Sequence, residues 1–291
     1  MNLYDNEYIK FAHDGNQYAC LIHYDDAPED PRKWENIGHM ICFHRRYRLG
    51  DEHKYETVEA FLADLVCEYV HIQKIEDYIR DGKTGMAIYE PDSERDEFRI
   101  MAQLYSGELY TVCSANTEAG LFSDENKYDI VDELSIREML SMLNDCGEIV
   151  IMPLYLYEHS GITMRTTAFN DPWDSGQVGW IYVSRTTFLH ETGYSEKSWP
   201  EQAIKMLDDE VRVYAEHLEG DCYGYELFML DNETGEWEDT GESCYGFFGS
   251  DIEDNGISDT VYGLHEAIER GNYELGQATK RVITTVKYEF E

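Results

Sequence analysis

The chain has 291 residues, enough for one large domain or two ordinary ones, and its 42% hydrophobic and 13% aromatic content argues against global disorder. Sixty Asp and Glu residues against 23 Lys and Arg residues give a formal net charge of −37. A charge of this sign repels polyanions, so we do not expect the chain to bind DNA or RNA directly.

The sequence predicts no membrane span and no secretion signal. No apolar run approaches the ~20 residues that cross a bilayer, and the first residues, MNLYDNEYIKFAHDG, have neither a basic start nor a long apolar segment. The seven Cys residues are dispersed without a CxxC pair, which favours reduced thiols over disulfides or a zinc site. We therefore expect a soluble, cytoplasmic protein without a metal or another cofactor.

The N-terminal half mixes predicted strands and helices. Strand-like segments at residues 7–12 and 17–24 flank the turn sequence DGN, and a third strand is expected at Ile37–Phe43. Behind Thr57, a candidate N-cap, apolar residues at helical spacing predict one long helix or two joined helices that end near Gly82.

Three further strand-like segments follow, at residues 85–90, 97–105 and 108–115. The sequence from Ser135 to Glu138 is a capping box, and it predicts a helix that Gly147 ends.

The C-terminal half repeats this mixture. A capping box from Ser198 to Glu201 predicts a helix that Gly220 stops, and a polar hairpin is expected around Asn232 and Gly235. Ser258 is expected to begin a last helix. Strands are predicted at residues 148–159, 178–184, 223–230, 243–249 and 281–291.

Because strands and helices do not follow a regular βαβ order, the predicted fold class is α+β, with mixed or antiparallel sheets and several amphipathic helices. We expect residues 1–291 to form a single domain. The alternative is a two-lobed division near residues 147–150, since each half then contains one Trp-containing segment.

Two similar segments stand out, EDPRKWENIGHMICFHRR at residues 29–46 (the first Trp block) and NDPWDSGQVGWIYVS at residues 170–184 (the second Trp block). Both place Asp-Pro before a Trp that is followed by an acid, and both continue through Gly into a strand-like stretch. Because no nucleophile and base accompany them, we interpret both as tight corners whose Trp packs over the core. The residues of this structural motif are Trp34, Gly38, Trp173, Asp174, Gly176 and Gly179.

These blocks also carry a resemblance. PRKWENIGHMICFHRRYRLGD and PLYLYEHSGITMRTTAFNDPWDSGQVGWIYVS resemble hallmark segments of a family of uncharacterised proteins from bacteriophages and other mobile elements, and YGYELF and ESCYGFFGSD are similar to further segments of that family. The resemblance implies a phage-type origin and expression in a bacterial cytoplasm. It implies no catalytic residue, because no activity is known for the family.

The negative charge is unevenly distributed. Residues Val213–Glu269 contain 16 acids and no Lys or Arg. By contrast, the helix behind Ser198 pairs Lys205 with Asp209 and Asp208 with Arg212 at i, i+4 spacing, which predicts a self-neutralised face. Uncompensated carboxylates can form a surface that imitates nucleic acid. The residues expected at this partner-binding surface are Glu226, Asp231, Glu233, Glu236, Glu238, Asp239, Glu242, Asp251, Glu253 and Asp254.

Two smaller clusters have competing interpretations. Asp251, Glu253 and Asp254 offer oxygen ligands of the kind that calcium takes, although their spacing is not that of an EF-hand. The basic sequence HRRYR is too local to overcome the charge of the whole chain. We expect it to pair with carboxylates, within a subunit or across a homo-oligomer interface. Its candidate contact residues are Arg45, Arg46 and Arg48.

Together, these features favour a phage-encoded binding protein, without catalytic residues, that antagonises a bacterial defence system. Its partner would be a basic host protein that handles nucleic acid, and the acidic surface would mimic that nucleic acid or occlude its binding site. One alternative is an enzyme of unrecognised type with a pocket beside the second Trp block. Another is a structural or replication-associated phage protein whose acidity serves only solvation.

Overall fold

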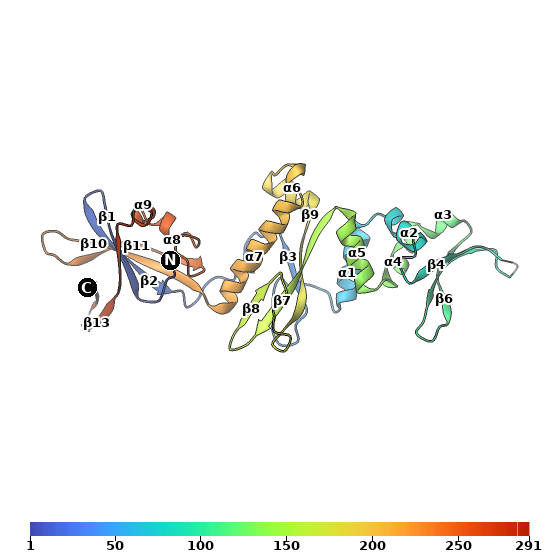
Figure 1. Ribbon diagram of the computed structural model, residues 1–291, viewed down its shortest axis with the longest axis horizontal. Helices are drawn as coiled ribbons and strands as arrows, with labels where there is room; N and C mark the ends of the chain where they lie inside the picture. The colour runs from blue at the N-terminus through green and yellow to red at the C-terminus, as the bar shows by residue number, and fades with distance from the viewer. Residues whose placement is uncertain (93, 284, 291) are drawn as a thin grey trace. The chain divides into compact units, whose positions relative to one another are not determined.

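The computed structural model describes residues 1–92, 94–283 and 285–290, the backbone alone for residues 279–283 and 285–289 (Figure 1). Helices and antiparallel sheets make an α+β fold, which confirms the predicted class. The chain forms two compact units, and each collects segments that are distant in the sequence. The first unit comprises Met1–Trp34, Tyr157–Arg165 and Val211–Glu291, and the second comprises Glu35–Leu156 and Thr166–Glu210.

The suggested division near residues 147–150 falls inside the second unit, between the end of one helix and the start of a strand. The chain leaves the first unit after Trp34 and re-enters it twice, so the two units are not an N-terminal and a C-terminal half. Composition along the chain carries no signal for such an interleaved arrangement.

The first unit is built on an antiparallel sheet in the order β11-β10-β2-β1-β12. One face packs against the short helices α8 and α9, where Ile22, Tyr225 and Leu264 are buried together. The opposite face buries Leu21 and Phe228. Its elements are β1 Glu7–His13, β2 Asn16–Tyr24, β10 Cys222–Leu230, β11 Trp237–Phe248, α8 Ile257–Thr260, α9 Leu264–Glu269, β12 Tyr273–Gln277, β13 Thr279–Ile283, β14 Thr285–Glu289 and the 3-10 turn Pro31–Lys33.

The second unit joins helices to two sheets. One sheet has the order β3-β9-β7, which β8 continues, and the other has the order β4-β5-β6. Phe61, Ile100 and Leu143 lie in one core, which also buries Ile41 and Trp180 of the first of these sheets. The elements are β3 His39–Cys42, α1 Val58–Tyr69, α2 Ile72–Arg80, β4 Met86–Tyr89, β5 Phe98–Gln103, β6 Leu109–Ala115, α3 Glu118–Leu121, α4 Asp124–Asp132, α5 Ile136–Cys146, β7 Ile149–Glu158, β9 Ser175–Ser184 and α6 Arg185–Thr192. Strand β8, Ile162–Arg165, lies in the segment that belongs to the first unit. Helix α7, Glu201–Glu219, crosses from this unit into the first.

The predicted helix starts at Thr57 and Ser135 are confirmed, whereas those at Ser198 and Ser258 are wrong, since Ser258 lies inside α8 behind the N-cap Gly256. The Thr57 hydroxyl accepts the Ala60 N–H, and Ser135 and Glu138 form the predicted capping box. The cap at Ser198 is wrong, because α7 begins at Glu201 and Ser198 ends a separate 3-10 turn. Trp199 precedes a proline and is therefore extended, at φ −81° and ψ 138°, so the helix cannot start before it.

The two Trp blocks meet in the second unit. Strand β3 of the first block pairs with β9 of the second, and Cys42 lies opposite Gly179. A Cβ at residue 179 would overlap the Ile41 carbonyl oxygen, so this strand pair needs glycine there. A Cβ at Gly38 would collide with the Leu207 and Glu210 side chains of α7.

This close approach predicts a position-specific loss of stability. Gly179→Ala should lower the Tm by roughly 2–12 °C, since overpacking costs about 1–3 kcal/mol and each kcal/mol shifts the Tm of a chain near this size by about 2–4 °C. The matched control is Gly176→Ala, where a Cβ meets nothing within 4 Å. It should stay within about 2 °C of the unmodified protein. Equal melting temperatures, followed by circular dichroism, would contradict the β3–β9 packing.

Candidate functional site

The β10–β11 hairpin (the acidic hairpin, Cys222–Phe248) carries seven of the ten acids expected at a partner-binding surface. It forms around Asn232 and Gly235 as predicted. Asp231 closes its turn, because Oδ1 accepts the Glu233 N–H at 2.7 Å and Oδ2 accepts the Thr234 hydroxyl at 2.9 Å. The hydrogen bond from the Glu233 N–H lowers the pKa of Asp231 most, and the bond from the Thr234 hydroxyl lowers it further. The charged carboxylate of Asp231 therefore helps to form the turn.

Strand β11 is an edge of its sheet, and its Glu238, Asp239 and Glu242 are exposed. The pairing with β10 skips Thr240 and Gly241, where the Gly241 N–H donates to Asp239 Oδ1 at 2.7 Å and the Glu242 N–H donates to the Thr240 hydroxyl at 3.2 Å. A second irregularity lies near Gly246, which like Gly241 has a positive φ. Bulges and charges of this kind block the addition of another strand. A partner would therefore contact this edge through side chains.

The carboxylates of the acidic hairpin differ in how far they are engaged. Glu226 Oε2 lies 3.6 Å from His23 Nε2, and Glu242 Oε1 accepts the Tyr225 hydroxyl at 3.3 Å. Burial raises the pKa of Tyr225 to about 12, and the Glu242 carboxylate adds to the rise. In contrast, Glu233, Glu238 and Asp239 form no ion pair with any residue that the structure describes. Their charges are available to a partner.

The remaining three acids of the expected surface lie after β11. Asp251 stabilises this loop, because Oδ2 accepts the Met1 amine at 2.8 Å and Oδ1 accepts the Glu253 N–H at 3.0 Å. The bond to the amine lowers the pKa of Asp251. Glu253 and Asp254 are exposed. Among the described residues, no three His, Cys, Asp or Glu side chains are grouped so that they could hold a metal ion, so the calcium interpretation gains no support.

The basic cluster is an ordered, exposed loop. His44 Nδ1 accepts the backbone N–H of Arg46 at 3.3 Å and that of Tyr47 at 3.2 Å. Arg45 and Arg48 are exposed and form no ion pair within the described part of the chain. For these two arginines the expected pairing within a subunit is therefore not found, and pairing across an oligomer interface stays a prediction.

The polar face of α7 is not neutralised as expected. Lys205 is exposed and has no ion pair with a described residue. Asp208 accepts the Thr166 hydroxyl, and Arg212 lies 3.0 Å from Glu216 Oε1. Helical spacing places Asp208 and Arg212 on one face of α7, but the two do not pair with each other. Asp208 is bonded to Thr166 from another segment, and Arg212 pairs with Glu216 in the next helical turn.

The two Trp blocks contain the same corner. Asp30 Oδ1 accepts the Arg32 N–H at 2.9 Å, and Asp171 Oδ1 accepts the Trp173 N–H at the same distance. In both blocks the aspartate before proline thus fixes the turn two residues on. Asp174 belongs to the second corner through its own N–H, which donates to Asp171 at 3.3 Å.

The prediction that both corner tryptophans pack over the core is wrong. Trp34 is 42% exposed and rests its ring edge on Phe248 at 5.6 Å between centroids, whereas Trp173 is 93% exposed. The corner uses only the backbone N–H of Trp173, so it does not require a buried indole. The buried tryptophan of the second block is Trp180, on β9, which is 7% exposed. A sequence signal for this exposure exists, since Pro172 and Trp173 occupy the tip of the turn that Asp171 begins.

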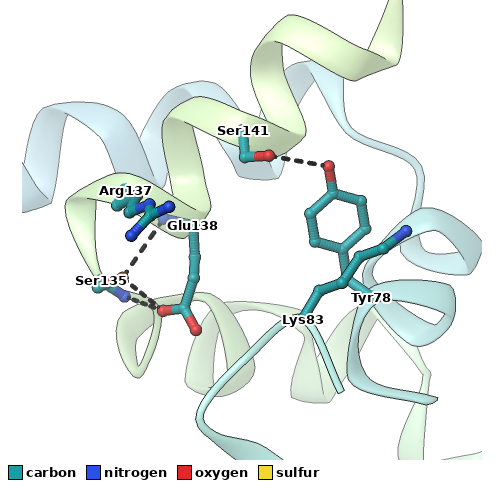
Figure 2. A pocket seen from close by; sticks show the side chains of 6 residues that line it. All are labelled: Tyr78, Lys83, Ser135, Arg137, Glu138 and Ser141. Carbon is teal, nitrogen blue, oxygen red and sulfur yellow. Dashed lines mark hydrogen bonds between the residues drawn. The ribbon is translucent and has the colours of Figure 1, made fainter. Parts of the chain in front are cut away.

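A cavity of about 440 Å³ lies elsewhere in the second unit, and Figure 2 shows the side chains around it. The Tyr78 hydroxyl donates to Asp145. Burial is the main cause that raises the pKa of Tyr78, and this hydrogen bond raises it further. Glu138 accepts the Ser135 N–H at 2.7 Å and the Gly85 N–H at 2.9 Å. Both groups are thus engaged in structure. The lining residues are Tyr78, Lys83, Ser135, Arg137, Glu138 and Ser141.

A second cavity, of about 210 Å³, lies in the first unit beside His13, Glu266 and Arg270. His13 is flanked by Glu266 Oε2 at 3.8 Å and Asp14 Oδ2 at 3.5 Å. Neither of these two cavities is lined by residues 170–184, where the enzyme alternative placed its pocket.

Comparison with protein-family models, with curated proteins and with solved structures finds no match for this chain. No helix in the described part of the chain combines the length and the apolar character needed to cross a membrane.

The exposure of the two tryptophans in the second Trp block predicts opposite effects on stability. Trp173→Ala should change the free energy of unfolding by no more than about 0.5 kcal/mol, because its side chain packs against almost nothing. Trp180→Ala should cost about 3–5 kcal/mol, since it leaves a cavity in the core. Denaturant unfolding followed by circular dichroism measures both. A loss of several kcal/mol for Trp173→Ala would show that the indole is structural after all.

Proposed function

We propose that this protein is a phage-encoded inhibitor of a bacterial defence system that binds a basic, nucleic-acid-handling host protein through its acidic hairpin. One observation carries the proposal. The run from Val213 to Glu269 has 16 acids and no Lys or Arg, and it places Glu233, Glu238 and Asp239 on the surface without ion pairs to described residues.

A protein that binds nucleic acid presents Lys and Arg to phosphates that carry one charge per ~1.7 Å of duplex. Carboxylates can form the same charge-assisted hydrogen bonds with these cations. From Asp231 to Glu242 the hairpin carries six acids in 12 residues. At ~3.3 Å per strand residue, this averages one acid per ~6.6 Å of chain, a lower density than that of DNA. The total of −37 adds a field that attracts a basic partner from a distance.

The host-directed part of the proposal is supported by the resemblance of the Trp blocks. The Trp blocks resemble segments of a phage and mobile-element family, and a protein of such origin acts within a bacterial cell. The acidic hairpin favours binding over an alternative in which acidity serves solvation, because it lies in a run of 57 residues with 16 acids and no Lys or Arg, and solvation alone does not require such a segregation of charge.

The test uses a panel of purified bacterial restriction endonucleases and RNA-guided nucleases. The unmodified protein should inhibit DNA binding by at least one of them. The variant Glu233→Gln, Glu236→Gln, Glu238→Gln, Asp239→Asn should weaken the inhibition roughly 4- to 30-fold at low salt, at about 0.2–0.5 kcal/mol for each exposed charge pair. The difference should shrink at high salt because exposed charges are screened. The side-chain amide that Asp239→Asn introduces keeps an oxygen for the Gly241 N–H, so the bulge should be retained.

The matched control removes the same charge from another hairpin. Glu90, Glu94, Asp96 and Glu97 are exposed acids between β4 and β5 that have no ion pair with a described residue. Changing them to Gln or Asn should affect inhibition much less. An equal loss from both sets would refute a local binding surface, and inhibition of no nuclease would refute the proposed function.

A further inference from the structure

Trp173 differs from the other tryptophans in its surroundings. Its indole has no hydrogen bond or ring contact with any described residue, and it is 93% exposed. Trp199 donates to the Gly147 carbonyl at 3.1 Å and packs on Phe188, and Trp237 packs on Phe290. A tryptophan buries about 150–250 Å² of surface when it packs. In the free protein, this apolar surface of Trp173 remains in water.

The segment that presents this indole (the Trp173 loop, Asp171–Ser175) is held in place. Asp171 Oδ1 accepts the N–H groups of Trp173 and Asp174, and the Ser175 hydroxyl donates to the Asp171 carbonyl. Pro172 further restricts the backbone. Strand β9 begins at Ser175 and lies between β3 and β7, so the loop is attached to a central strand. Little backbone entropy would be lost if this loop entered an interface.

The surroundings of Trp173 indicate the chemistry of what covers it. Between Thr166 and Ser184 the chain has two acids, Asp171 and Asp174, and no Lys or Arg. At the neighbouring Gly176 nothing within 4 Å excludes a side chain, so packing does not explain the glycine. The surface beside the indole is therefore open at Gly176, and Asp171 places a carboxylate two residues before Trp173.

We propose that Trp173 anchors a partner protein by inserting its indole into an apolar pocket rimmed by Lys and Arg. Large, rigid aromatic side chains in such pockets dominate many protein interfaces, and the Asp171 carboxylate together with the net charge of −37 complements a cationic rim. Nucleic-acid bases also stack on indoles, but a polyanion is repelled by Asp171 and the net charge of −37. The partner's basic character rests on the proposed function, whereas the anchoring role rests on the Trp173 loop.

The test places the photocrosslinker p-benzoylphenylalanine at residue 173 of the full chain in bacterial cells, with Tyr105 as the control position. Tyr105 is also fully exposed, at the β5–β6 turn. We expect one protein adduct specific to residue 173, with the crosslinked site flanked by Lys or Arg. Binding of that purified partner should weaken about 30-fold or more for Trp173→Ala and less for Trp173→Phe, without a change in Tm.

Each result of the crosslinking and binding experiments supports or overturns the anchoring role of Trp173. The absence of an adduct specific to residue 173, an adduct with nucleic acid or lipid, or less than about a 3-fold effect of Trp173→Ala on binding would overturn the anchor. If no adduct specific to residue 173 forms but the acidic-hairpin variant loses nuclease inhibition, the proposed function is supported and the anchoring role of Trp173 is rejected. An adduct with a basic protein that does not handle nucleic acid, with the 30-fold effect, supports the anchor, and the nuclease panel decides the proposed function separately.

Discussion

The close approach of β3 and β9 is the constraint on which the second unit depends. It brings together segments more than a hundred residues apart in the chain, and it requires that residue 179 have no side chain beside the Ile41 carbonyl. Because β9 is fixed in this way, the corner that precedes it is fixed as well, and Asp171 holds the Trp173 loop at the start of a central strand. A strand placed for packing reasons thus presents an indole to solvent.

Aspartate has two roles in this strongly acidic chain. In several loops its carboxylate accepts the N–H two residues further on, which closes a turn while the charge remains at the surface. This pattern is found at Asp25, Asp30, Asp92, Asp171, Asp231, Asp239 and Asp251. Seven of the 60 acids therefore also stabilise local structure against the self-repulsion that the negative charge causes. An acid count alone overstates the surface free for a partner, and Glu233 and Glu238 are better candidates than Asp231 or Asp251.

Several features that depend on neighbours in the sequence were predicted correctly, although the capping box at Ser198 was not, and features that depend on distant segments could not be predicted. The Thr57 cap, the Ser135 capping box and the hairpin at Asn232 are decided within a few residues, and all three are found. The interleaved units and the Asp208–Thr166 bond depend on which segments meet in the folded chain. Trp173 shows a further limit, because hydrophobicity favours burial while turn geometry places the same residue at an exposed tip.

The two proposed contacts would act at different stages of binding. Exposed carboxylates act over roughly a Debye length, about 8 Å at physiological ionic strength, and so influence how fast and in which orientation a basic partner arrives. An indole acts only on contact, when water leaves its surface, and so influences how long the partner stays. The acidic hairpin belongs to the first unit and Trp173 to the second. Attraction and retention can therefore be changed separately, and a partner that lacks the apolar pocket would be attracted by charge but released quickly.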